Sequence, residues 1–148
     1  MKKLIKSNPF LFSLWYHFYR KHRGVKINYF NSETKFLIDG YPRSGNTFAV
    51  SLTKNIFNEK NFLHHFHAIA PIKISLNKDI PVFILIREPK EAITSNYLKT
   101  FALKNESIPS SINKLLLKRL TLEYLNFYRF VLKKKKEIRI IDFYDLIK

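Results

Sequence analysis

The chain has 148 residues, 46% of them hydrophobic and 16% aromatic, which is enough for one domain with a core and argues against intrinsic disorder. It contains no Cys, so disulfides and thiolate metal sites are excluded. A net charge of +16 favours anionic partners: nucleotides, sulfated or phosphorylated ligands, nucleic acid, or an acidic membrane surface. Abundant Lys, Asn, Ile and Phe are also typical of an AT-rich genome, which offers a neutral explanation of the charge.

Residues 1–32 contain no Asp or Glu, and one helical face of their aromatic stretch carries Leu11, Leu14, Trp15 and Phe18. The apolar run is too short to span a bilayer, and bulky residues stand where a signal peptide needs a small-residue cleavage site. We expect the protein to be cytoplasmic. Residues 1–32 are expected to form a helix and a connector that pack on the domain or on a partner. A surface-lying membrane helix, with peripheral contact through residues 1–26, is the alternative.

From residue 33 onward, short apolar runs alternate with helical patterns. Helices are predicted over 46–57, from Pro89 onward, and after Ser110 and Ser111, which can cap a long helix. Residues 68–80 show weak periodicity and carry no clear prediction. The alternation predicts an α/β domain over 33–148, a three-layer P-loop-like fold with a central parallel sheet flanked by helices. The predicted strands are 36–39, 61–67, 81–86 and 138–143.

The loop after the first predicted strand has the spacing of a phosphate-binding turn. Its sequence is Gly40-Tyr41-Pro42-Arg43-Ser44-Gly45-Asn46-Thr47. The nucleotide-binding pattern G-x-x-x-x-G-K-[ST] is matched at each fixed position except one, where Asn46 replaces Lys. Arg43 supplies the cation, Ser44 and Thr47 add hydroxyl groups, and Phe48 is placed to stack on a base. The loop therefore indicates binding of a phosphate-like group without ordinary ATP chemistry.

A second cation follows the strand over 81–86. Arg87 comes directly after this strand, and Ser95 lies about two turns into the next helix. Ligands of parallel sheets bind at the carboxyl ends of the strands, so Arg87 and Ser95 are expected to meet the same ligand as the loop. An Arg with a hydroxyl group suits a terminal phosphate. The alternative is that Arg87 pairs with Glu91.

Together, the two motifs resemble the paired signature of the sulfotransferase family, over residues 35–147. The motifs are Tyr41-Pro42-Arg43-Ser44-Gly45-Asn46-Thr47-Phe48 and Ile84-Leu85-Ile86-Arg87-Glu88-Pro89 with Ser95. These enzymes transfer a sulfonate group from 3′-phosphoadenosine 5′-phosphosulfate (PAPS) to a hydroxyl group. The resemblance implies that Arg43 contacts the sulfonate and the leaving phosphate, that Ser44, Gly45, Asn46 and Thr47 cradle the 5′-phosphate, and that Phe48 stacks on adenine.

The same resemblance implies that Arg87 and Ser95 bind the 3′-phosphate. Near the end of the chain, Phe143-Tyr144-Asp145-Leu146 is similar to the family's Tyr-Glu-Asp-Leu, with Phe in place of the first Tyr. Family members usually continue into a basic, Gly-containing segment that closes over the nucleotide. We therefore expect the C-terminal part of the family domain to be missing, and binding of PAPS to be better retained than catalysis.

Three histidines lie in or after the second predicted strand: His64, His65 and His67. The family places a His here that deprotonates the acceptor hydroxyl, and a near-neutral pKa suits this role. On a strand, His65 and His67 share one side, so His67 is favoured as the base and His65 is second. The cluster also suggests metal binding, but no carboxylate or Cys lies nearby in the sequence, and no metal is expected.

Two other classes of function stay open. One is a nucleotide kinase or NTPase-like protein, against which Asn46 counts. The other is a non-catalytic basic module that binds nucleotides or polyanions, although no specific nucleic acid is expected. For the sulfotransferase hypothesis the partners are PAPS or its product and an acceptor whose hydroxyl belongs to a carbohydrate, a lipid or a small molecule.

Overall fold

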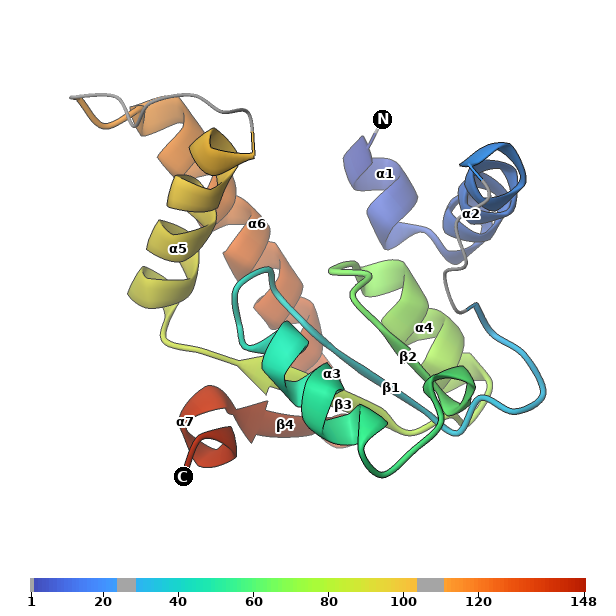
Figure 1. Ribbon diagram of the computed structural model, residues 1–148. Helices are drawn as coiled ribbons and strands as arrows, with labels where there is room; N and C mark the ends of the chain where they lie inside the picture. The colour runs from blue at the N-terminus through green and yellow to red at the C-terminus, as the bar shows by residue number, and fades with distance from the viewer. Residues whose placement is uncertain (1, 24–28, 104–110) are drawn as a thin grey trace.

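The computed structural model describes residues 2–23, 29–103 and 111–148 (Figure 1). At the centre of this described part, four parallel strands pair in the order β2-β1-β3-β4. The predicted three-layer α/β fold, with a central parallel sheet flanked by helices, is confirmed. The strands are β1 (Phe36–Gly40), β2 (Phe62–His64), β3 (Val82–Ile86) and β4 (Arg139–Asp142).

Helices cover both faces of this sheet. Successive side chains of a strand point to opposite faces, so Leu37 and Ile38 enter different core clusters. The Leu37 cluster includes side chains of α4, α5 and α6, whereas the Ile38 cluster includes side chains of α3. Because the strands are parallel, α3, α5 and α7 all begin on the same side of the sheet, where the carboxyl ends of the strands lie. These helices are α3 (Asn46–Lys54), α4 (Ile69–Asn77), α5 (Pro89–Ala102), α6 (Lys114–Lys133) and α7 (Phe143–Leu146).

Strand β2 and helix α3 are shorter than the sequence predicts. The strand predicted over 61–67 ends at His64, because His65 and His67 adopt φ angles of 60° and 50°, which lie outside the β region. The helix predicted over 46–57 ends at Lys54, where the Asn55 N–H turns back to the Leu52 carbonyl at 3.2 Å. His65 and His67 therefore lie in a loop after β2, and His64 is the last residue of the strand.

Helix α4 occupies most of residues 68–80, the stretch whose weak periodicity carried no clear prediction. Most of its residues are buried, including Ala70, Ile72, Ile74 and Ser75. A helix enclosed on most sides has no polar stripe, and its sequence therefore lacks the periodicity of an amphipathic helix.

Side-chain caps set two boundaries that the apolar pattern misplaces. Helix α6 begins at Lys114 because the Asn113 side chain accepts a hydrogen bond from the Leu116 N–H at 2.9 Å. Ser111 precedes this cap, and Ser110 lies outside the described residues. Strand β4 ends at Asp142, whose carboxylate accepts from the Tyr144 N–H at 2.8 Å and starts α7. The strand predicted over 138–143 is thus shorter at both ends.

The N-terminal segment forms two helices, α1 (Lys2–Ser7) and α2 (Pro9–Arg23), rather than the single predicted helix. The Asn8 side chain caps α2 by accepting from the Leu11 N–H at 3.1 Å. Phe12 and Tyr16 are buried in a cluster with Ile74 of α4, so the segment packs on the domain through a face beside the predicted one. Within the described ranges, no helix has the length and apolarity that a membrane span requires.

Candidate functional site

The loop between β1 and α3 presents backbone N–H groups at the carboxyl edge of the sheet. Arg43 and Gly45 both adopt left-handed backbone angles, with φ of 72° and 87°. Such angles turn successive N–H groups toward one side and form a concave anion site. The first N–H groups of α3, those of Asn46, Thr47 and Phe48, have no partner within the helix. An Arg in the left-handed region is strained, which is a cost found most often at functional sites.

Buried side chains hold the loop on the side that faces the core. The Ser44 hydroxyl is fully buried and lies 3.1 Å from the Tyr128 hydroxyl of α6, which donates to the Leu85 carbonyl at 2.7 Å. The Asn46 amide turns inward and donates to the Tyr41 carbonyl at 3.0 Å. Burial raises the pKa of Tyr128 well above its usual range, so this hydroxyl stays protonated. Ser44 and Asn46 therefore hold the loop through their side chains; the Ser44 backbone N–H also donates to the Tyr41 carbonyl at 3.1 Å, so of these two residues it is Asn46 that lines the cavity.

Phe143, the first residue of α7, closes one side of the loop. A Cβ atom added to Gly45 would lie 2.4 Å from Phe143 Cδ2, so no side chain fits at position 45 without moving the ring. The same ring lies under Arg87, with 4.7 Å between its centre and the guanidinium carbon. Phe143 thus packs against both predicted phosphate-binding segments.

Arg87, after β3, points to the loop and also pairs with a carboxylate. Its Nη1 donates to the Arg43 carbonyl at 3.3 Å, and its Nε donates to Glu91 Oε2 at 2.9 Å. The Tyr144 hydroxyl donates to the other Glu91 oxygen at 2.6 Å, and these two bonds, that of Tyr144 first, lower the pKa of Glu91. The pair with Glu91, which the sequence offers as the alternative, is present and holds the guanidinium beside the loop, whereas binding of a ligand by Arg87 stays a prediction.

The two predicted phosphate-binding groups are in direct contact. Arg43 Nε donates to the Ser95 hydroxyl of α5 at 2.8 Å, across 52 residues of sequence. With the bond from Arg87 to the Arg43 backbone, this contact joins the end of β1 to the end of β3 and to α5. The two arginines consequently face a shared space rather than two separate sites.

His67 is the histidine that the structure orients most strongly. Its Nδ1 lies 2.8 Å from the Gly40 carbonyl oxygen, which assigns the Nδ1 proton to this bond and leaves Nε2 with a lone pair. Asp39 is fully buried; its Oδ2 accepts the His67 backbone N–H at 2.8 Å and its Oδ1 lies 3.4 Å from Nδ1. Burial alone would lower the pKa of His67, but the bond to Asp39, its charge and the Gly40 carbonyl together raise it.

The other two histidines are placed differently. His65 Nδ1 lies 2.8 Å from His64 Nδ1, and His64 Nε2 lies 3.3 Å from Glu59 Oε1. Burial, followed by the charges of His64 and His67, lowers the pKa of His65. Contrary to the sequence-based expectation, carboxylates do lie near this cluster, since Asp39 and Glu59 both contact it. In the described part of the chain, however, no group of three or more potential ligands is arranged to hold a metal ion.

These segments enclose a cavity of about 440 Å³ that is open to solvent. Its size falls within the range of about 300–1,000 Å³ that is usual for small-molecule sites. Three further lining residues, Asn96, Lys99 and Thr100 of α5, were not predicted from the sequence. Lys99 could have been, because it follows Ser95 at the i,i+4 spacing that places both on one helix face. Among the described residues, none that lines the cavity is an Asp or a Glu. The lining residues predicted from sequence are Arg43, Gly45, Asn46, Thr47, Phe48, His65, His67 and Arg87.

Comparison of the chain with models of protein families, with curated proteins and with solved structures found no match. The groups that line the cavity are therefore the basis on which a function is assigned. They include loop amides, two arginines, an oriented histidine and an aromatic ring, Phe48, whose side chain is partly exposed.

Proposed function

We propose that this chain is a sulfotransferase domain, which binds PAPS in the cavity and transfers its sulfonate group to an acceptor hydroxyl. The observation that carries this proposal is that Arg43, in the loop after β1, and Arg87, directly after the neighbouring parallel strand β3, line one cavity, with Arg87 Nη1 donating to the Arg43 backbone carbonyl at 3.3 Å. A nucleotide with separate groups on its 3′ and 5′ positions can present one to the loop that carries Arg43 and the other to Arg87, because both segments line one cavity.

Each end of the donor has a distinct set of partners in this proposal. The amides of Gly45 to Phe48 and the Arg43 side chain face the 5′-phosphosulfate, where the helix N-terminus adds positive potential. Arg87 and Ser95 bind the 3′-phosphate, for which the phosphate displaces the present bonds to Glu91 and Arg43. The exposed ring of Phe48 offers a stacking surface to adenine.

PAPS supplies an activated sulfonate, whose bond to the 5′-phosphate oxygen breaks as the acceptor oxygen bonds to sulfur. The Nε2 lone pair of His67 takes the proton of the acceptor hydroxyl, because the Gly40 carbonyl holds the other ring nitrogen as a donor. Arg43 and the loop amides neutralise the charge that remains on the departing phosphate oxygen. Asp39 stabilises the imidazolium that forms, since its carboxylate oxygen is 3.4 Å from Nδ1.

Calorimetry with adenosine 3′,5′-bisphosphate, AMP and ATP tests the proposal directly. The bisphosphate is expected to bind about 10- to 100-fold more tightly than AMP, because each charge-assisted hydrogen bond to the 3′-phosphate contributes about 1.5–3 kcal/mol. Equal affinity for AMP and the bisphosphate would contradict the assignment of Arg87 and Ser95. Tighter binding of ATP, with hydrolysis in the presence of Mg²⁺, would favour an NTPase instead.

The pH dependence of transfer is expected to follow the ionisation of His67. Because the folded environment raises the pKa of this ring above about 6.5, the base becomes protonated and the rate falls as pH decreases through that raised value. Replacing Asp39 with Asn removes the main group that raises the pKa of His67 and should move the acidic limb of the rate profile to lower pH.

Folding stability changes with pH in the opposite direction to the rate. The raised pKa of His67 stabilises the fold below about pH 6.5, and this contribution is lost as pH rises through the folded-state pKa.

Imidazole NMR titration of the wild type and the Asp39→Asn variant measures this shift without an acceptor. In the wild type, His67 should titrate at higher pH than His65, whose pKa burial lowers. An acidic limb that does not move with the His67 titration in the Asp39→Asn variant would assign the proton transfer to another group.

A further inference from the structure

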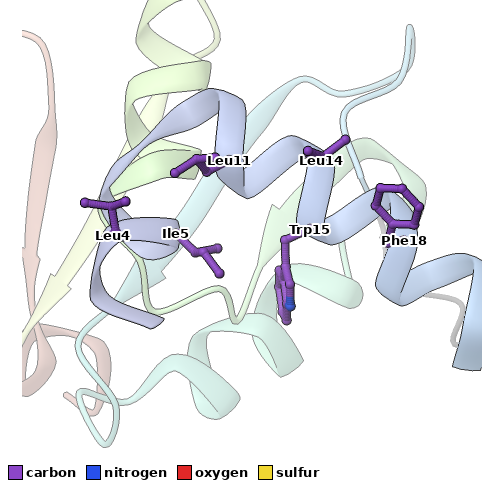
Figure 2. Close-up of a pocket in the computed structure, with 6 residues that line it drawn as sticks. All are labelled: Leu4, Ile5, Leu11, Leu14, Trp15 and Phe18. Atoms are coloured by element: carbon purple, nitrogen blue, oxygen red, sulfur yellow. The ribbon is translucent and has the colours of Figure 1, made fainter. Parts of the chain in front are cut away.

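The first two helices expose an apolar face that the proposed sulfonate transfer does not use. Six side chains of α1 and α2 line a shallow hollow of about 430 Å³ (Figure 2). Leu14, Trp15 and Phe18 of α2 are 47%, 43% and 54% exposed, and Leu4 of α1 is 63% exposed. The N-terminal apolar face, as this surface is called below, consists of Leu4, Ile5, Leu11, Leu14, Trp15 and Phe18.

The opposite side of the helix pair is fixed to the domain. Phe12 and Tyr16 are each only 3% exposed and pack around Phe66, with ring centres 5.8 and 6.0 Å away. The Lys73 ammonium group of α4 donates to the Ser7 carbonyl of α1 at 3.1 Å. The N-terminal apolar face therefore belongs to helices that are already packed on the domain through their other side, and it is exposed in that packed arrangement.

The segment that carries this face has charged side chains of a single sign in its sequence. Residues 1–32 contain no Asp or Glu, and Lys6 of α1 is exposed. Amphipathic helices that lie on membranes combine apolar side chains, often with Trp, and flanking cations that are attracted to anionic lipids. The Lys and Arg residues of this segment are Lys2, Lys3, Lys6, Arg20, Lys21, Arg23 and Lys26.

We propose that the N-terminal apolar face docks on the surface of an anionic phospholipid bilayer. The charge selects this occupant over a second copy of the chain, because two copies meeting through this face would bring two acid-free, basic segments together. An anionic lipid surface instead complements the cations while its acyl boundary accepts the apolar side chains. Helices α1 and α2 then lie in the plane of the interface, with the domain on the aqueous side.

Trp15 gives a specific readout, because it is the single Trp of the chain. The full chain is mixed with vesicles of phosphatidylcholine containing about 30% phosphatidylserine, and with pure phosphatidylcholine vesicles. Trp15 emission should shift to shorter wavelength with the anionic vesicles, and lipids brominated on their acyl chains should quench it. Raising the salt from about 0.05 M to about 0.5 M should weaken binding severalfold, because salt screens the attraction.

A matched pair of double variants separates this face from general adsorption of a basic protein. Leu14→Ser with Phe18→Ser should weaken vesicle partitioning about tenfold or more. Leu122→Ser with Leu132→Ser, on α6, removes side chains that are 49% and 56% exposed and should leave partitioning unchanged. The proposal is overturned if Trp15 emission does not respond to anionic vesicles, if both double variants lose equal affinity, or if the wild type forms a dimer that Leu14→Ser with Phe18→Ser dissociates.

Discussion

Replacing His67 with Asn is expected to lower the rate of sulfonate transfer by about 10²- to 10⁴-fold, because the acceptor hydroxyl loses its general base. The Asn amide can still donate toward the Gly40 carbonyl, which His67 Nδ1 contacts at 2.8 Å, so the loop should keep its shape. Affinity for adenosine 3′,5′-bisphosphate should consequently stay within about threefold of the wild type. The rate is measured as formation of this product from PAPS with a panel of sugars, a lipid alcohol and a phenol as acceptors.

His65→Asn is the matched control, since His65 lines the same cavity. The His65 Nδ1 atom contacts His64 rather than a backbone carbonyl group. No backbone acceptor therefore holds the His65 ring with its other nitrogen directed to the cavity. We expect a much smaller loss of rate for this variant. A larger loss with His65→Asn than with His67→Asn would exchange the roles of the two residues, and full activity of both variants would remove histidine from the mechanism.

The groups that follow the strands could be predicted because their placement is local. Arg87 comes directly after an apolar strand and Arg43 lies in the loop after another, and because parallel strands end on the same side of a sheet, topology alone brings the two segments together. The Arg87 pair with Glu91 was likewise visible in the sequence, since i,i+4 residues are neighbours on a helix. Short-range geometry and sheet polarity therefore account for most of the predicted site.

The supports of the site could not be predicted, because they come from distant parts of the chain. Tyr128 is 84 residues from Ser44, and helical periodicity identifies it only as a core residue. In the sequence, Asp39 is only the polar last residue of a predicted apolar strand. Its contact with His67 depends on the path of the loop after β2. The inward turn of the Asn46 amide is equally hidden, although it changes which loop atoms a ligand can reach.

Arg87→Ala is expected to weaken binding of adenosine 3′,5′-bisphosphate by about 10- to 100-fold while changing AMP affinity by less than about threefold. The lost guanidinium would otherwise make one or two charge-assisted bonds to the 3′-phosphate, each of about 1.5–3 kcal/mol, and AMP lacks that phosphate. The fold should tolerate the change, because the ion pair with Glu91 is partly exposed and such pairs contribute little to stability. Calorimetry with both nucleotides measures the difference.

Arg119→Ala provides a matched control for the loss of one positive charge. Arg119 also pairs with a carboxylate at i,i+4, its Nε lying 3.8 Å from Glu123 Oε1, but this pair is on the exposed side of α6 and outside the cavity. If attraction by the net charge of +16 explained nucleotide binding, both variants would weaken it by the same small factor. A selective loss of the bisphosphate in Arg87→Ala alone is the outcome that local recognition requires, whereas parallel losses of bisphosphate and AMP would mean that Arg87 does not contact the 3′-phosphate.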